Sequence, residues 1–129
     1  MIPMKKSEIL DRWTILNMKV RLDDRVRVEM SQYDQELQKI IDEATVFPML
    51  FIKTLCALQE ANSKIWVLEA SLRQEYKDDP LNTGEVTDVE LAKRAKLIRE
   101  HNKTRIKAKQ EIDKMFGESQ DFKVDHASQ

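Results

Sequence analysis

The fold is decided by the stretch Asp78-Asp79-Pro80-Leu81-Asn82-Thr83-Gly84, which is followed closely by Thr87-Asp88-Val89-Glu90. Proline cannot continue a preceding helix, and Asn, Thr and Gly favour turns, so residues 81–84 predict a loop. Thr87 and Glu90 have the spacing of a capping box, in which each side chain satisfies a backbone donor at the start of a helix. The helices on either side of this loop are therefore expected to run antiparallel.

The segments that flank the loop are long and free of helix breakers. Pro48 is tolerated in a first helical turn, because the N–H that it lacks would be unpaired there. A helix is therefore predicted over 48–78. After the loop a second helix is predicted over 87–116, where Gly117 is a natural C-terminal cap.

Toward the N-terminus, the sequence predicts one further helix over 7–44. Ser7 can cap free backbone N–H groups, and no breaker follows until about Thr45. The chain has only two glycines and three prolines among 129 residues, which also favours helix. The expected fold is all-α: an antiparallel bundle of three long helices, completed by dimerisation. Residues 1–117 form a single domain in this interpretation, and residues 118–129 form a polar tail.

Composition excludes several classes of function. The formal net charge is −1, which argues against a bulk electrostatic partner such as nucleic acid. The basic residues of 93–109 lie all round their helix without interleaved aromatic residues, and we interpret them as a solvated face. Val46–Ile52, the longest apolar stretch, is too short to span a membrane, and the N-terminus lacks the apolar core of a signal peptide. A cytoplasmic protein is expected.

Neither a metal site nor a cofactor is expected. His101 and His126 each lack a second His or Cys at the spacing of metal ligands. The single cysteine, Cys56, lies in an apolar run and is interpreted as a buried structural thiol.

Polar residues interrupt the inward stripe of each predicted helix. Steps of three and four residues place them at similar heights, with Asp23 near Glu69, Lys19 near Arg73, and Asn62 near both Asn102 and Arg105. Because cations outnumber carboxylates, the layer would suit a carboxylate, phosphate or sulfate. The candidate ligand-binding residues are Arg12, Lys19, Asp23, Asn62, Glu69, Arg73, Asn102, Arg105 and Lys109.

Two other interpretations stay open. A polar layer can be purely structural and fix helix register in a scaffold or regulator, with Lys19 and Lys109 reaching out to solvent. The chain could also be a small all-α enzyme, similar to the helical chorismate mutases or nucleotide pyrophosphohydrolases. The paired carboxylate motif of the pyrophosphohydrolases is missing, however, since Glu60 and Glu69 are nine residues apart. We therefore expect a binding or interaction module in preference to an enzyme, and name no catalytic residue.

An apolar segment predicts self-association. Val46–Ile52 and then Leu55, Cys56 and Leu58 are apolar on more faces than a three-helix bundle can cover. Exposed patches of this kind usually meet another protein surface. A homodimer or higher oligomer through Val46–Leu58 is expected.

Three blocks of sequence resemble a family of short all-helical bacterial proteins of unknown function, found near polysaccharide and glycosyltransferase genes. The blocks are Ile9-Leu-Asp-Arg12-Trp13-Thr-Ile-Leu-Asn-Met-Lys19, then Asn62, Trp66, Glu69 and Leu72-Arg73, then Asn102, Arg105, Lys109, Ile112 and Gly117. The chain departs from the family pattern at Lys103 and Thr104, where acidic or arginine residues usually follow the asparagine. The resemblance implies a helical fold and no particular activity.

Overall fold

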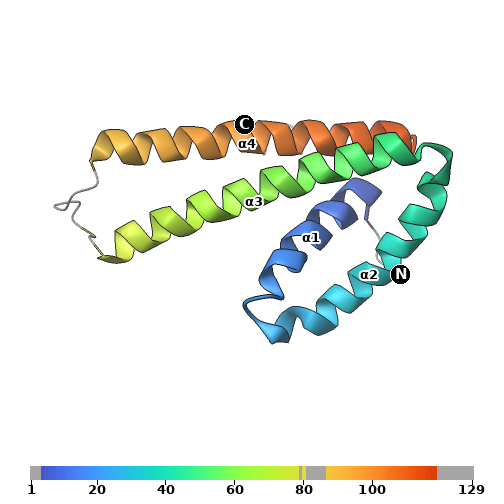
Figure 1. Ribbon diagram of the computed structural model, residues 1–129, viewed down its shortest axis with the longest axis horizontal. Coiled ribbons are helices and arrows are strands. Elements are labelled where there is room, and N and C mark those ends of the chain that lie inside the picture. Colours follow the sequence, from blue (N-terminus) through green and yellow to red (C-terminus); the bar gives the residue numbers. More distant parts are fainter. Residues whose placement is uncertain (1–3, 79, 81–86, 119–129) are drawn as a thin grey trace.

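The computed structural model describes residues 4–78, 80 and 87–118, and all of the regular structure in these residues is helical (Figure 1). The all-α prediction is confirmed. Four α-helices and two short 3₁₀ segments follow one another in the order α1 Lys6–Lys19, η1 Asp24–Val26, α2 Arg27–Glu43, η2 Ala44–Val46, α3 Pro48–Asp78 and α4 Asp88–Met115.

The predicted first helix over 7–44 is wrong as a single helix, because the chain turns back after Lys19. Asp23 has extended backbone angles, and its carboxylate accepts a hydrogen bond from the backbone N–H of Arg25 at 3.0 Å. Short acidic side chains compete in this way for backbone donors, which favours a cap over a helix interior. The segment therefore forms two shorter antiparallel helices, α1 and α2, instead of one long one.

The other predicted boundaries agree closely with the structure. Thr87 caps α4, since its hydroxyl accepts the backbone N–H of Glu90 at 3.2 Å. Gly117 follows α4 with φ of 66°, the left-handed conformation that glycine adopts without steric cost. The predicted loop at 81–84, and the predicted tail apart from Glu118, lie outside the described residues.

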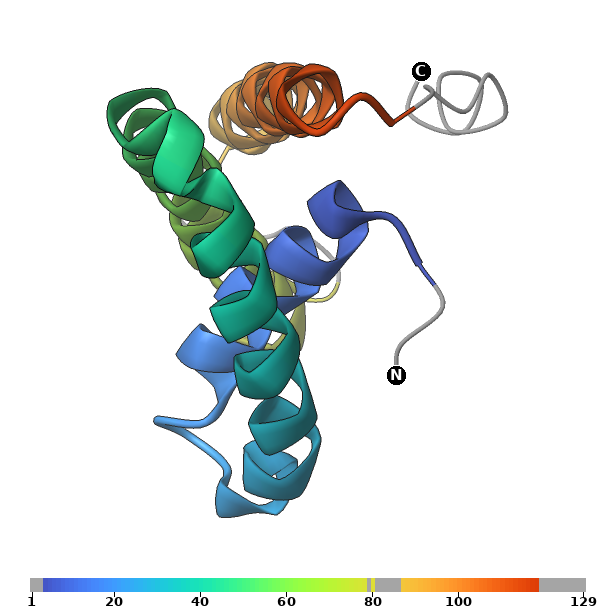
Figure 2. The same cartoon turned by 90° about the vertical axis from the view of Figure 1, so that its right-hand side faces the viewer.

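The helices form two antiparallel hairpins. Helices α3 and α4 lie side by side, and the α1–α2 hairpin packs against one half of that pair (Figures 1 and 2). Helix α1 contacts each of the other three helices, whereas α2 lies further out. The remaining half of the α3–α4 pair projects beyond the α1–α2 hairpin, and we call this half the arm.

The apolar core lies where all four helices meet. Leu10 of α1, Leu58 of α3 and Ile112 of α4 are fully buried at its centre, and Tyr33 and Ile40 close it from α2. Of the described residues between 63 and 107, in contrast, none is fully buried. The core therefore includes only one end of the α3–α4 pair, and in the described part of the arm the two helices pack only against each other.

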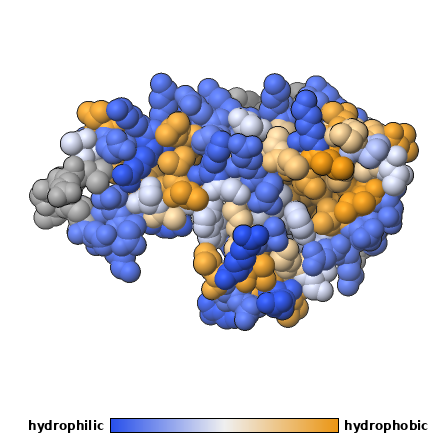
Figure 3. All heavy atoms as spheres, in the orientation of Figure 1, coloured by the Kyte–Doolittle hydropathy of each residue, from blue (hydrophilic) through white to orange (hydrophobic). Residues whose placement is uncertain are grey.

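The corner between α2 and α3 exposes apolar side chains. Val46 is 83% exposed, Met49 77%, and Ile52 54%. On the face shown in Figure 3, apolar residues gather over the end of the molecule at which α3 begins. Cys56 is exposed as well, so the expectation of a buried thiol is wrong. Among the described helices, none is long and apolar enough to cross a membrane.

Candidate functional site

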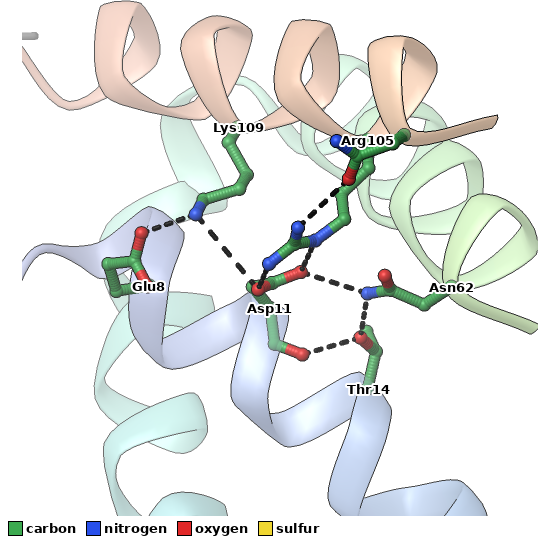
Figure 4. A network of polar contacts seen from close by, with 7 residues as sticks. Glu8, Asp11, Thr14, Asn62, Arg105 and Lys109 are labelled. Carbon is green, nitrogen blue, oxygen red and sulfur yellow. Dashed lines mark hydrogen bonds and ion pairs between the residues drawn. The ribbon is translucent and has the colours of Figure 1, made fainter. Parts of the chain in front are cut away.

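A buried carboxylate joins α1 to both long helices. Asp11 is 2% exposed, and its two oxygens accept hydrogen bonds from Arg105 of α4, with Nε at 2.9 Å and Nη2 at 2.5 Å (Figure 4). Asn62 of α3 donates to Asp11 at 2.9 Å and to the hydroxyl of Thr14 at 2.7 Å. The Thr14 hydroxyl in turn donates to the backbone carbonyl of Asp11 at 2.7 Å. The Asp11 cluster, formed by Asp11, Thr14, Asn62 and Arg105, therefore connects three helices.

The cluster keeps its charges paired. Burial alone would raise the pKa of Asp11, but the hydrogen bonds and charge of Arg105, assisted by Asn62 and Lys109, hold that pKa below its ordinary value of 3.8. The same contact with Asp11 raises the pKa of the Arg105 guanidinium. Lys109 is paired with Glu8 and lies 4.0 Å from the second oxygen of Asp11. Arg105 and Lys109 of α4 thus both have carboxylate partners on α1.

An open cleft of about 490 Å³ begins beside this cluster, where the arm leaves the α1–α2 hairpin. Figure 3 shows the molecule notched in this region. The size is within the usual range for small-molecule sites. The cleft is lined by Ile15, Met18 and Lys19 of α1, Asn62, Ile65, Trp66, Glu69 and Arg73 of α3, and Asn102 and Arg105 of α4.

Helical spacing explains why these side chains meet. Residues three or four positions apart share one face of a helix, and the α3 wall of the cleft is such a row: Asn62, Trp66, Glu69 and Arg73. On α4 the same rule brings Asn102 next to Arg105, and Arg105 Nη1 donates to Asn102 Oδ1 at 3.1 Å. The arrangement needs no unusual backbone.

Six of the nine candidate residues predicted from periodicity line this one cleft. They are Lys19, Asn62, Glu69, Arg73, Asn102 and Arg105. Lys19, Glu69 and Arg73 are exposed at the rim, so the residues form an open groove and not the internal layer that was expected. Lys109 lies beside the Asp11 cluster instead.

Two candidates fall elsewhere. Arg12 is exposed and does not line the cleft. Asp23 does not approach Glu69, because the turn after α1 intervenes; it pairs with Arg25 at 2.8 Å. The second discrepancy follows from treating 7–44 as one straight helix.

The periodicity argument missed Asp11, Thr14 and Glu8. Helix α1 is buried on two faces, because it packs against three helices. One face is the apolar stripe that contains Ile9 and Leu16, and the other carries Ser7, Asp11 and Thr14 at steps of four and three. A search for a single stripe found the first face only. The polar spacing on the second was visible in the sequence.

A second buried acid lies at the other end of α1. Asp113 of α4 is 6% exposed, and its Oδ1 has no hydrogen-bond partner. Burial raises the pKa of Asp113 above 3.8, although the nearby hydroxyl of Ser7 and the charge of Lys5 act against the rise. The carboxylate therefore opposes folding when it is ionised.

Among the described residues, no group of three or more His, Cys, Asp or Glu side chains is placed to hold a metal ion. Comparison of the chain with protein-family models, with curated proteins and with solved structures finds no match.

Proposed function

We propose that the protein is a small helical binding module whose cleft holds a small anionic ligand, bearing phosphate or carboxylate. The observation that carries this proposal is the pair of cations at the rim, Lys19 and Arg73. Neither has an ion-pair partner among the described residues, and both line the same cleft, in which Glu69 is the single lining carboxylate. Arg in particular can grip a carboxylate or phosphate with two parallel hydrogen bonds.

The Asp11 cluster supports this proposal because the residues with a structural role differ from those with free charges. Its hydrogen bonds already pair the charges of Asp11 and Arg105, so that the cluster needs no ligand and serves to hold α1 against α3 and α4. In this proposal the purely structural role, which the sequence left open, belongs to the Asp11 cluster. The cleft, in contrast, is open to solvent, and its cations Lys19 and Arg73 have no ion-pair partner among the described residues.

Thermal unfolding with added ligands tests the proposal. A compound that binds only the folded state raises the free energy of unfolding, by about 2.7 kcal/mol at a concentration of one hundred times Kd. The gain in stability is seen as a higher Tm. The panel should contain phosphate, pyrophosphate, dicarboxylates, sugar phosphates and nucleotides. At least one anion is expected to raise Tm of the wild type and to leave Tm of a Lys19→Met, Arg73→Met double variant unchanged.

The matched control is a Lys96→Met, Lys107→Met double variant. Both lysines are exposed on α4 and neither lines the cleft, so the variant removes the same net charge. It should respond to the anion as the wild type does. Equal loss of the response in both double variants would show that the anion binds through net charge alone, and the cleft proposal would fail.

We further propose that the module is a homo-oligomer that assembles through the exposed side chains of Val46–Leu58, since Phe51 and Leu58 of this segment are buried in the core. The support is the exposed apolar corner, at which Val46, Met49 and Ile52 are each more than half exposed. The residues of α3 that line the cleft begin at Asn62, which follows this segment along the helix, so assembly through the corner would leave the cleft accessible. The resemblance to polysaccharide-associated proteins remains a prediction.

A further inference from the structure

The cleft arranges its chemistry in a definite order along α3. Its α3 wall is the row Asn62, Trp66, Glu69 and Arg73. At about 1.5 Å of rise per residue, this row is roughly 16 Å long. It presents, in sequence, an amide, an aromatic ring, a carboxylate and a guanidinium. A ligand that uses the whole cleft must therefore be elongated and chemically different at its two ends.

The inner end of the cleft offers one free hydrogen-bond acceptor and one free donor. Asn62 uses its amide hydrogens on Asp11 and Thr14, which leaves its Oδ1 as an acceptor. Arg105 donates to Asn102 Oδ1, which fixes that amide and leaves Nδ2 of Asn102 as a donor. The edge of a nucleobase carries both kinds of group, so it can pair with the acceptor of one amide and the donor of the other.

The middle of the cleft suits a flat ring. Trp66 is half-buried in the wall, with Ile65 beside it and Ile15 and Met18 opposite on α1. An indole face stacks on any heteroaromatic ring, whereas a simple sugar phosphate or dicarboxylate has no such ring to place there. The apolar side chains exclude water around the stacked ring.

The outer end suits a sugar and a phosphate. Glu69 can accept hydrogen bonds from hydroxyl groups, which a ligand consisting only of phosphate does not provide. Of the residues that line the cleft, Lys19 and Arg73 are the furthest along α1 and α3 from the contact between Asp11 and Asn62, and they supply the charge for a phosphate. The carboxylate between the ring and the cations would repel an anion placed at the centre. The charge of the ligand must therefore be at its outer end.

We infer that the cleft binds a nucleotide, with its base held between the two amides and stacked on Trp66, and its phosphate held between Lys19 and Arg73. This inference rests on the proposed function and specifies its ligand. The order amide, aromatic ring, carboxylate, cation along α3 matches the order base edge, base face, sugar hydroxyls, phosphate along a nucleotide.

Fluorescence of Trp66 tests the inference directly. The chain has two tryptophans, and Trp13 lies outside the cleft with its indole N–H bonded to Asp34 at 2.8 Å. A Trp13→Phe variant therefore leaves Trp66 as the single reporter. Titration with the four ribonucleoside monophosphates should quench Trp66 saturably for at least one of them. That nucleotide should bind about tenfold or more tightly than ribose 5-phosphate, since stacking contributes about this much.

Further variants assign the two ends of the ligand. In the Trp13→Phe background, Lys19→Met with Arg73→Met should weaken the nucleotide about tenfold or more and leave binding of the free nucleoside unchanged. Trp66→Leu, followed by calorimetry, should weaken nucleotide and nucleoside alike. The Lys96→Met, Lys107→Met variant should match its parent, which excludes an effect of net charge.

The outcomes separate the inference from the proposed function. Suppose that ribose 5-phosphate binds as tightly as every nucleotide, and that its binding depends on Lys19 and Arg73. The cleft is then an anion site and the nucleotide inference is overturned. If no nucleotide, sugar phosphate or simple anion binds at millimolar concentration to a protein that circular dichroism shows to be folded, both are overturned.

Discussion

Replacement of Asp11 by Ala should destabilise the protein more than any other single truncation of a polar side chain. Asp11 is 2% exposed and accepts bonds from two donors of Arg105 and one of Asn62. Its removal leaves a partly buried guanidinium without its carboxylate and Asn62 with only Thr14 as partner. Breaking a buried ion pair from one side costs about 3–5 kcal/mol.

The expected value lies at the lower end of that range. The side chain of Arg105 is 29% exposed beside an open cleft, so water can reach the guanidinium in the variant. We therefore expect a loss of about 3 kcal/mol in the free energy of unfolding, or roughly 10 °C in Tm. Urea unfolding followed by circular dichroism, at neutral pH, measures the loss.

A double-variant cycle with Arg105→Met isolates the pair. Because each single change strands the partner, the losses of Asp11→Ala and Arg105→Met should not add, and the coupling energy should reach about 1.5 kcal/mol or more. Acid titration provides a second check. The folded pKa of Asp11 is lowered, so its contribution is complete above 3.8 and disappears as pH falls through the folded pKa. Additive losses, or a difference between wild type and Asp11→Ala that does not shrink below pH 3.8, would refute the reasoning.

Three further outcomes are expected. Asp113→Asn should raise the free energy of unfolding by about 1 kcal/mol at neutral pH, because it removes an ionised carboxylate with an unpaired oxygen. The pKa of Asp113 is raised in the folded state, so this gain, measured by urea unfolding, should vanish as pH falls below 3.8. Asp23→Ala should lower the midpoint of urea unfolding through loss of the cap on η1, and an unchanged midpoint would show that the cap does not stabilise the turn. The side chain of Met49 is 77% exposed, and Met49→Glu should give a monomer by light scattering where the wild type is an oligomer. The change should alter the free energy of unfolding of the monomer by no more than about 0.5 kcal/mol. A wild type that is itself monomeric at high concentration would contradict the assembly proposal.

The two long helices could be predicted from local signals alone. Pro48, Thr87 and Gly117 act within one turn of their own position: α3 begins at Pro48, α4 begins one residue after Thr87, and α4 ends two residues before Gly117. The break after α1 also has a local signal, Asp23 followed by Asp24, but the sequence does not show whether this signal outweighs continuation of the helix. A cap of this type stabilises by about 1 kcal/mol, which continued helix packing could have outweighed.

Most of the polar residues that line the cleft could be predicted, because they occupy one face on each helix, although an internal layer was expected in place of an open groove. Asn62, Glu69 and Arg73 share a face of α3 whatever lies opposite, and this is a property of spacing. The Asp11 cluster was not predictable to the same degree. Its partners, Asn62 and Arg105, are 51 and 94 positions away from Asp11, and only the fold of α1 between the long helices brings them together.

The most direct test of the central claim is an NMR titration of the ¹⁵N-labelled protein with adenosine 5′-monophosphate. Chemical shift changes are expected at Lys19, Glu69, Arg73 and the indole N–H of Trp66, saturating together with a single Kd. Changes confined to the exposed basic residues of α4, such as Lys96 and Lys103, or no changes with this or any other ribonucleoside monophosphate at millimolar concentration, would show that the cleft does not hold a nucleotide.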